Sequence, residues 1–371
     1  MSHSAGVPGF EQARALFRDG VAHYEAGRME AAEHAFAASL ALLPGRPSTL
    51  TNLGAARLKL GRVAQAVDVL REALAQEPDN AEALGHLAGG LAELGHADEA
   101  LAAVGRALQL QPAAGAAWLL QATLLRERGE AEAARRSYRQ ALAHGADPQL
   151  VAFALGALEG TGAPPAPPLH YVEQLFDNYA DGFDAHLVEA LQYRAPQLLV
   201  EGLARPRHAS ALDLGCGTGL AGPWLRPRCE RLEGIDLSAA MVDRARARNL
   251  YDEVRQGDLV SILASTPQRH DLLFAADVFI YVGALEPVFA GAARVLSPGG
   301  EFCFSVEAAD DRDDWTLRMS LRYAHSERYI RMLARQHGFA VRHVARHPLR
   351  IDQGQPVAGL FAWLDRPGHA A

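Results

Sequence analysis

Apolar positions in the first 148 residues recur with helical spacing and with a longer period of 34 residues. Two registers of apolar residues, one of glycines and one of prolines, keep this period. They are Ala32, Ala66, Ala100 and Ala134; Phe36, Leu70, Val104 and Tyr138; Gly27, Gly61, Gly95 and Gly129; and Pro44, Pro78 and Pro112. The pattern predicts two helices per period, repeated four times.

Each register has a physical reason in such a unit. Glycine permits the tight turn between the two helices, alanine lets them approach closely, and proline ends the second helix. The pattern resembles the tetratricopeptide repeat, although a generic helical bundle is an alternative. We expect an all-α solenoid over residues 11–160, with a helix over residues 148–159 capping its open end.

The segment after the solenoid reads TGAPPAPP over residues 161–168, with four prolines in eight positions. Proline-rich segments are stiff and extended. We therefore expect a linker over residues 161–170 that separates two domains.

Beyond residue 170 short apolar runs alternate with helical patterns, which is typical of an α/β domain. The first predicted strand begins near residue 209, the second covers 232–237, and the third ends with Asp258. The fourth and fifth cover 270–282 and 301–307, and two more strands cover 339–349 and 357–365. The predicted domain covers residues 171–367.

A glycine-rich turn follows the first of these strands, in the order Asp213-x-Gly215-x-Gly217-x-Gly219. Residues 217–222 also fit GxGxxG, so a dinucleotide-binding domain is the alternative. A carboxylate two residues before the first glycine suits a ligand ammonium better than a pyrophosphate. With Asp258 and the closing strand pair, the segment resembles the class I S-adenosylmethionine-dependent methyltransferases, which implies a Rossmann-like seven-stranded sheet.

This resemblance implies S-adenosyl-L-methionine as cofactor, no metal, and a role for several residues. Gly215, Gly217 and Gly219 would let the backbone approach the methionine part, with Cys216 in the turn and Asp213 near the ammonium. Asp236 would accept hydrogen bonds from both ribose hydroxyls, and Asp258 would meet the adenine amino group beside Leu259. Leu237, Met241 and Asp277 complete the expected cofactor site on these elements.

The segment between the linker and the first strand carries Phe176, Tyr179 and Phe183 at helical spacing. For Phe176 we expect core packing, whereas Tyr179, Phe183, His186, Tyr193 and Arg194 are candidates for a lid over the cofactor. Candidate assistants in methyl transfer are His186, Tyr281 and His325, and Arg322 and Arg350 are candidates to face the substrate. A general base is needed only if the acceptor carries a proton.

The two domains together resemble a bacterial group of predicted tetratricopeptide-repeat methyltransferases. We expect the repeats to bind a protein or peptide, with a small-molecule acceptor or a scaffold that does not catalyse as the alternatives. The groove positions are Arg14, Phe17, Val21 and Tyr24; Ser48, Thr51, Ala55 and Leu58; Glu82, Gly85, Gly89 and Ala92; and Ala116, Leu119, Thr123 and Arg126. Because Lys59 is the only lysine, the groove lacks a lysine clamp for a terminal carboxylate.

Composition narrows the classes of protein that remain. The chain has 371 residues, 49% hydrophobic and 22% charged, and a net charge of −8, which argues against a general nucleic-acid partner. Three cysteines without CxxC spacing indicate neither a disulfide framework nor a zinc site. No signal pattern or apolar stretch long enough to span a bilayer is recognised, so we expect a cytoplasmic protein without a membrane partner.

Overall fold

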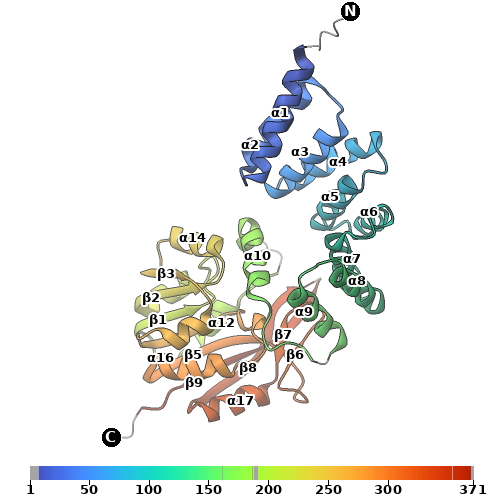
Figure 1. Ribbon diagram of the computed structural model, residues 1–371. Coiled ribbons are helices and arrows are strands. Elements are labelled where there is room, and N and C mark those ends of the chain that lie inside the picture. The colour runs from blue at the N-terminus through green and yellow to red at the C-terminus, as the bar shows by residue number, and fades with distance from the viewer. Residues whose placement is uncertain (1–7, 161, 186, 188–190, 353, 369–371) are drawn as a thin grey trace, which may run out of the picture. The chain divides into compact units, whose positions relative to one another are not determined.

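The computed structural model describes residues 8–160, 162–185, 187, 191–352 and 354–368 of the chain (Figure 1). By the contacts within it, the chain divides into two compact units, Met1–Val151 and Ala152–Ala371. The first unit is helical, and the second is built around a mixed sheet.

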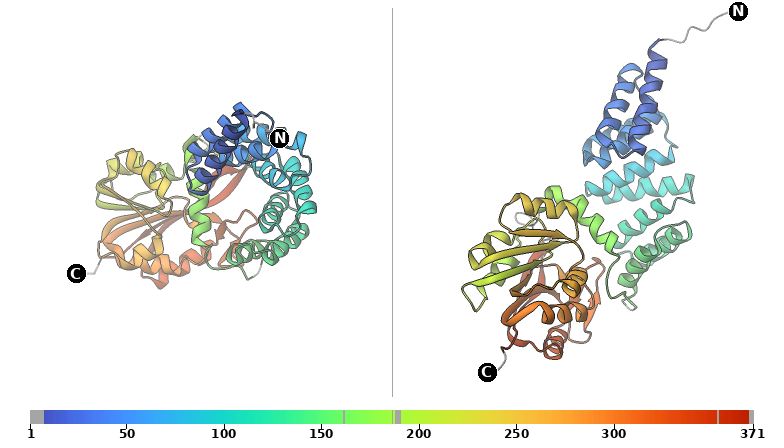
Figure 2. Two further views of the ribbon diagram at one scale, coloured as in Figure 1. Left: turned by 45° about the horizontal axis from the view of Figure 1, so that its top comes forward. Right: turned by 60° about the vertical axis from the view of Figure 1, so that its left-hand side comes forward.

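The first unit is a row of antiparallel helix pairs (Figures 1 and 2). Its helices are α1 (Pro8–Glu25), α2 (Met29–Leu42), α3 (Pro47–Lys59), α4 (Val63–Gln76), α5 (Ala81–Glu93), α6 (Ala97–Leu110), α7 (Gly115–Glu127) and α8 (Ala131–Ala143), followed by the start of α9 (Pro148–Glu159). This is the predicted series of four helix pairs and a further helix.

The 34-residue registers form the core of this unit. The alanines at 32, 66, 100 and 134 are all fully buried, and so is the larger apolar residue four positions after each. The turn glycines at 27, 61, 95 and 129 have φ between +69° and +78°. Glycine is therefore required there, because other residues are strained in this conformation.

The first helices of successive pairs lie beside one another, since α3 contacts α5 and α5 contacts α7. Gly85 and Gly89 on α5 have open space where a Cβ atom would stand. Thr51, Ala55 and Arg126, by contrast, are buried. These three predicted groove positions are therefore part of the packed interior.

Helix α9 contains the division between the units, and its residues from Ala152 onward belong to the second unit. Phe153 is fully buried, with its ring 5.8 Å from that of Tyr171. The proline-rich segment that follows is also held by the second unit, since Tyr323 donates a hydrogen bond to the carbonyl of Pro164. The segment predicted as a linker thus packs on the sheet domain.

The sheet has the order β3-β2-β1-β4-β5-β7-β6, with β9 between β5 and β8. Its strands are β1 (His208–Leu214), β2 (Cys229–Asp236), β3 (Glu253–Gln256), β4 (His270–Ala275), β5 (Leu296–Ala308), β6 (Trp315–Leu317), β7 (Tyr323–His325), β8 (Ala340–Asp352) and β9 (Gln355–Asp365). The first five are parallel, and β8 and β9 form the predicted antiparallel hairpin. The short β6–β7 pair beside the end of β5 was not predicted.

Alternating side chains of the strands form two cores, one on each face of the sheet. On β5, Phe302 and Phe304 belong to one core and Cys303 to the other. Helices α15 (Leu259–Ser265), α16 (Glu286–Val295) and α17 (Glu327–Gln336) cover the first face. Helices α12 (Ala195–Glu201) and α13 (Gly222–Leu225) cover the second.

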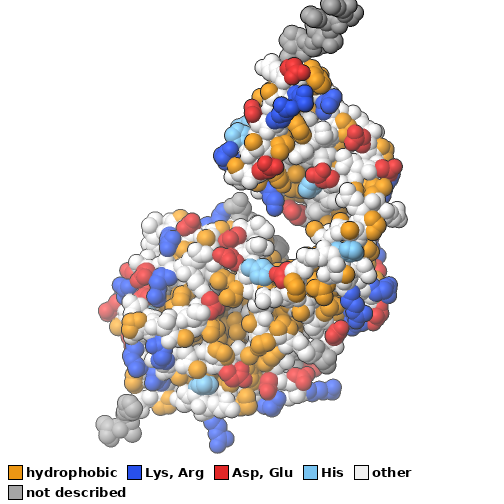
Figure 3. Space-filling model, in the orientation of Figure 1, with side chains coloured by type: hydrophobic (Ala, Val, Ile, Leu, Met, Phe, Trp, Pro, Cys, Tyr) orange, Lys and Arg blue, Asp and Glu red, His pale blue; other side chains and the backbone are white. Residues whose placement is uncertain are grey.

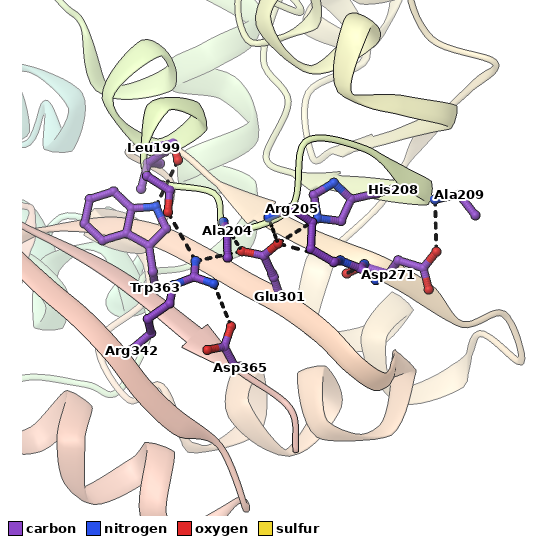
Figure 4. A network of polar contacts seen from close by, with 11 residues as sticks. Leu199, Ala204, Arg205, His208, Ala209, Asp271, Glu301, Arg342, Trp363 and Asp365 are labelled. Carbon is purple, nitrogen blue, oxygen red and sulfur yellow. Dashed lines mark hydrogen bonds and ion pairs between the residues drawn. The ribbon is translucent and has the colours of Figure 1, made fainter. Parts of the chain in front are cut away.

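A network of hydrogen bonds and ion pairs surrounds the buried Glu301 side chain, at the edge of the sheet where the parallel strands begin (Figure 4). Glu301 accepts hydrogen bonds from the backbone of Ala204 (2.8 Å) and Arg205 (3.0 Å) and from Arg342 (2.6 Å). His208 lies 3.0 Å from the same carboxylate. Burial raises the pKa of Glu301, but these partners outweigh burial and lower the pKa to about 2.

On the face drawn in Figure 3, acidic and basic side chains are interspersed over each unit. Within the part of the chain that the structure describes, none of the helices is long and apolar enough to cross a membrane.

Candidate active site

A cavity of about 650 Å³ lies in the second unit at the edge where the parallel strands end. Acidic residues and glycines from the strand ends line one part of it, and apolar and aromatic side chains line much of the rest. The principal lining residues are Asp213, Gly215, Cys216, Gly217, Asp236, Leu237, Asp258, Leu259, Asp277, Tyr281, Arg322, Phe176, Tyr179, Phe183 and Tyr193. Parallel sheets of this type bind ligands at this edge.

The glycine-rich turn after β1 is left-handed at each of its three glycines. A Cβ atom on Gly215 would stand 2.2 Å from the Val278 side chain. On Gly217 it would meet only the Phe183 ring, at 3.7 Å, so the space over this residue is open. Gly219 does not line the cavity; it allows close packing with Tyr251, 3.1 Å from where its Cβ atom would be.

Asp236 ends β2 and fixes this turn. Its Oδ2 accepts a hydrogen bond from the Gly217 N–H at 2.8 Å, and its Oδ1 accepts one from the Ser238 N–H at 3.0 Å. Burial raises the pKa of Asp236, and these backbone donors oppose the rise. A carboxylate held in this way keeps lone pairs for further donors in the cavity.

Asp258 follows β3 and caps α15. Its Oδ2 accepts hydrogen bonds from the N–H and the hydroxyl of Ser261, each at 2.8 Å. Leu259 lines the cavity beside it. Asp258 thus has a local structural role as N-cap in addition to its position in the cavity wall.

Asp213, on β1, is 1% exposed and accepts a hydrogen bond from the Tyr251 hydroxyl at 2.7 Å. Burial raises the pKa of Asp213 to about 7, against the lowering effect of that hydrogen bond. Sequence reasoning missed Tyr251, because it lies between α14 (Ala239–Ala247) and β3, outside every motif.

Asp277 follows β4 with φ +56°, and its N–H donates to the Ser305 hydroxyl at 2.9 Å. Its carboxylate accepts hydrogen bonds from Arg350 at 2.8 and 3.0 Å. Burial raises the pKa of Asp277 to about 6, although Arg350 opposes the rise.

Arg350, a candidate to face the substrate, lines the cavity, but its charge is already paired. The residue is 3% exposed, and besides Asp277 it pairs with Glu307. Two carboxylates therefore already use its charge. Arg322 is more open, with 28% of its side chain exposed, and it forms an ion pair with Asp352 at 3.0 Å.

Three aromatic side chains from the segment before β1 cover the cavity. Phe176 lies on α10 (Leu169–Tyr179), with its ring 5.1 Å from that of Tyr281. Phe183, on the short helix α11 (Phe183–Ala185), lies 6.1 Å from Phe176 and 5.3 Å from Tyr179. Phe176, expected in the core, thus lines the cavity with the two predicted lid residues.

Two acids that sequence reasoning missed hold this aromatic cover to the strand-end loops. Asp177 accepts hydrogen bonds from the Ser238 hydroxyl and from the Ala240 N–H. Asp184 accepts hydrogen bonds from Thr218, in the glycine-rich turn, and from Arg248. Both acids were visible in the segment, but only the fold shows their partners.

The remaining predicted residues lie away from the cavity wall or outside the described residues. His325 is fully buried, and its Nε2 lies 2.9 Å from the carbonyl oxygens of Val282 and Gly283. Burial lowers the pKa of His325 to about 4, so it supports the loop after β4 as a neutral ring. Met241 is buried in α14, and Arg194 approaches Gln197 at 3.4 Å. His186 lies outside the described residues.

Among the described residues, no cluster of histidine, cysteine, aspartate or glutamate could hold a metal ion.

Two family models match the chain. Residues 212–304 match a model described as a methyltransferase domain, and residues 23–89 and 57–124 match one described as a tetratricopeptide repeat. These matches confirm the predicted combination of repeats with a class I methyltransferase domain, the domain type whose cofactor is S-adenosylmethionine.

Proteins similar in sequence to this chain are named as methyltransferases of several kinds. A malonyl-[acyl-carrier protein] O-methyltransferase of Enterobacter lignolyticus is 31% identical over 164 residues, which cover 43% of this chain and 63% of the relative. Methyltransferase-like protein 27 of Homo sapiens is 33% identical over 141 residues, or 35% of this chain and 55% of the relative. The chain thus spans 63% and 55% of the length of these relatives.

Among solved structures, the N-methyltransferase NodS of Bradyrhizobium japonicum in complex with S-adenosylhomocysteine is 21% identical. The match covers 53% of this chain and 98% of that one, with a TM-score of 0.43.

Proposed function

We propose that this chain, in which tetratricopeptide repeats precede a methyltransferase domain, transfers a methyl group from S-adenosylmethionine to an acceptor that the repeats help to select. The observation that carries the proposal is the position of Asp236. Both of its oxygens are fixed by backbone N–H groups, at 2.8 and 3.0 Å, at the edge of a large cavity. Such a carboxylate can accept hydrogen bonds from two neighbouring hydroxyls.

The residues present fit this cofactor. Gly217 leaves its backbone open to the cavity. Asp213 is suited to the ammonium, Asp236 to the ribose, and Asp258 with Leu259 to the adenine. The acids lie at or just after the carboxyl ends of neighbouring parallel strands, in the sheet order β3-β2-β1, so they can hold one extended ligand.

S-adenosylmethionine, when bound, supplies a methyl group made electrophilic by its sulfonium. The chain has to align the acceptor and exclude water. Phe176, Tyr179 and Phe183 form the apolar cover that excludes water. Tyr281 is the one of the three candidate assistants that lies in the described cavity wall, and burial raises its pKa. Its hydroxyl is therefore suited to donate a hydrogen bond that orients an acceptor.

Asp277 is the group suited to receive a proton from an acceptor that carries one. Its pKa of about 6 allows both protonation states near neutral pH. Arg350 holds the carboxylate in place through two contacts. Tyr281 and Asp277 thus supply orientation and proton transfer from the same loop after β4.

Calorimetry on the full chain tests the cofactor. S-adenosylhomocysteine, the product form of the donor, should bind, and reduced nicotinamide adenine dinucleotide should not. Binding of the nicotinamide cofactor alone would reject the proposed reaction and leave only the fold.

The role of the repeats is tested with paired substitutions on α5 and α6. Gly85, Gly89 and Gly105 each have open space where a Cβ atom would stand. Gly85→Arg with Gly89→Arg places two arginines at predicted groove positions of α5. Gly105→Arg places one arginine on α6, the second helix of the same pair, outside the predicted groove. Transfer of labelled methyl to macromolecules in a lysate should fall with the double variant and persist with Gly105→Arg.

Other outcomes assign the alternatives. Label found only in small molecules, unaffected by either variant, would indicate a small-molecule acceptor and repeats used for assembly. Tight binding of S-adenosylhomocysteine without any transfer would indicate a scaffold that does not catalyse.

A further inference from the structure

We infer that residues 163–169 are a fixed wall on the acceptor side of the cavity, and that this wall limits the size of the acceptor. That the molecule limited by this wall is the methyl acceptor rests on the proposed function.

Two carbonyl groups anchor the segment. The Tyr323 hydroxyl donates to the carbonyl of Pro164 at 2.7 Å, and the Ala284 N–H donates to the carbonyl of Pro165 at 2.9 Å. Prolines have no N–H to donate, so a proline-rich segment is anchored chiefly through its carbonyls. Consecutive carbonyls are used here, and both donors belong to the sheet domain.

The fit around these anchors is close. A Cβ atom on Gly283 would lie 2.7 Å from the Pro165 carbonyl oxygen and 2.6 Å from the Tyr323 ring. One on Gly156 would lie 3.0 Å from the Cα atom of Ala163. Glycines thus allow both α9 and the loop after β4 to contact the segment directly.

Tyr323 is itself held from several sides. It is fully buried, and its ring lies 6.1 Å from that of Phe153 on α9 and 5.5 Å from that of Trp315 on β6. The helix that ends the repeat series therefore supports the tyrosine that anchors the wall. The β6–β7 pair, which was not predicted, thus supplies both Tyr323 and the Trp315 ring that packs against it.

The wall is anchored on the β4–β7 side of the sheet, away from the strand ends at which the cofactor acids lie. Ala166, Pro167 and Leu169 line the cavity together with Val282 and Arg322. Val282 follows β4 and Arg322 precedes β7, whereas the cofactor acids lie at the ends of β1 and β2 and after β3. A molecule that receives the methyl group must fit between these two sides.

The test uses thiol accessibility in the full chain. All three native cysteines are buried, so a single introduced cysteine can be followed by mass spectrometry during alkylation with iodoacetamide. Pro167 is buried and Leu169 is 52% exposed. Pro167→Cys should react slowly, and Leu169→Cys provides the reference for an accessible thiol.

Adding Tyr323→Phe to Pro167→Cys removes one anchor, and adding Gly283→Ala displaces the segment from its other side. Tyr323→Phe should raise the alkylation rate about two- to tenfold, as expected for the loss of one hydrogen bond. Gly283→Ala should also raise it, because the added methyl group clashes with the Pro165 carbonyl. Tyr138→Phe, which removes a buried hydroxyl in the repeats, should leave the rate unchanged.

The inference is overturned if Pro167→Cys alone reacts as fast as Leu169→Cys. It is also overturned if neither anchor variant raises the rate, or if Tyr138→Phe raises it equally. Failure of S-adenosylhomocysteine to bind would count against the proposed function alone, because the alkylation rates do not depend on it.

Discussion

The Oδ2 atom of Asp236 accepts a hydrogen bond of 2.8 Å from the N–H of Gly217, so the acid that ends β2 fixes the glycine turn that follows β1. Residues nineteen positions apart thus form one binding surface. The carboxylate has two functions in the proposed site, since it shapes the turn and binds the ribose.

Replacing Asp236 with alanine should weaken S-adenosylhomocysteine binding about 10- to 150-fold. This range corresponds to about 1.5–3 kcal/mol for lost hydrogen bonds to a charged group. Titration calorimetry on the folded variant measures the change. Asp243→Ala, which removes an acid 77% exposed on α14, should leave affinity unchanged. Equal affinities for the Asp236 variant and the wild type would contradict the assignment.

Asp213 should make cofactor affinity depend on pH. Because the pKa of Asp213 is about 7, its charged fraction grows between pH 6 and 7, below the pKa of about 7.7–8.0 of an α-amino group. Affinity for S-adenosylhomocysteine should therefore rise across this window. Tyr251→Phe removes a hydrogen bond that lowers the pKa of Asp213, so it should shift the rise to higher pH.

The control for this prediction is Asp213→Asn, whose affinity should be nearly constant over the same pH range. The linked effect on unfolding has the opposite sign. A carboxyl whose pKa is raised by folding binds more protons in the folded state, so its contribution to stability falls as pH rises from about 4 to 7. A flat affinity profile for the wild type would count against Asp213.

Two glycines in the repeats should respond oppositely to alanine. On Gly54 of α3 a Cβ atom would stand 2.5 Å from the Leu70 Cγ atom, whereas on Gly85 of α5 it would meet nothing within 4 Å. Gly54→Ala should lower the free energy of unfolding by about 1–3 kcal/mol through overpacking. Gly85→Ala should raise it by about 0.5–1 kcal/mol through helix propensity. Urea denaturation measures both, and changes of the same sign would argue against the packing described.

Glu301→Gln should destabilise the second unit by about 3 kcal/mol, because it removes a buried carboxylate from the partly buried Arg342 and from His208. Glu253→Gln, at a surface ion pair with a side chain 42% exposed, should cost less than about 1 kcal/mol. Because folding lowers the pKa of Glu301 to about 2, its contribution is present above about pH 4 and is lost as pH falls towards 2. Denaturation of the full chain at several pH values would show whether this dependence disappears in the variant.

The repeats could be predicted closely because each register residue acts within its own helix pair. Ala66 and Leu70 repeat at a fixed spacing, and the packing that buries them is local. The strand ends that carry Asp213 and Asp236 were also predictable, because parallel strands bring their carboxyl ends to the same edge.

Contacts between distant segments could not be predicted from spacing. Tyr251 reaches Asp213 from 38 residues away, and Tyr323 reaches Pro164 from 159 residues away. Nothing in the sequence indicates that Asp277 and Glu307 neutralise the charge of Arg350. Such partners depend on which segments the fold brings together, as β8 brings Arg350 to the loop after β4.

Transfer of labelled methyl from S-adenosylmethionine to a lysate, compared between the wild type and Asp236→Ala, tests the central claim most directly. The wild type should place label in the macromolecular fraction, and the variant should place at least about tenfold less there at limiting cofactor, in line with its weaker binding. Absence of label from every fraction with the wild type, or equal labelling by the two proteins, would contradict the assignment of this cavity to methyl transfer.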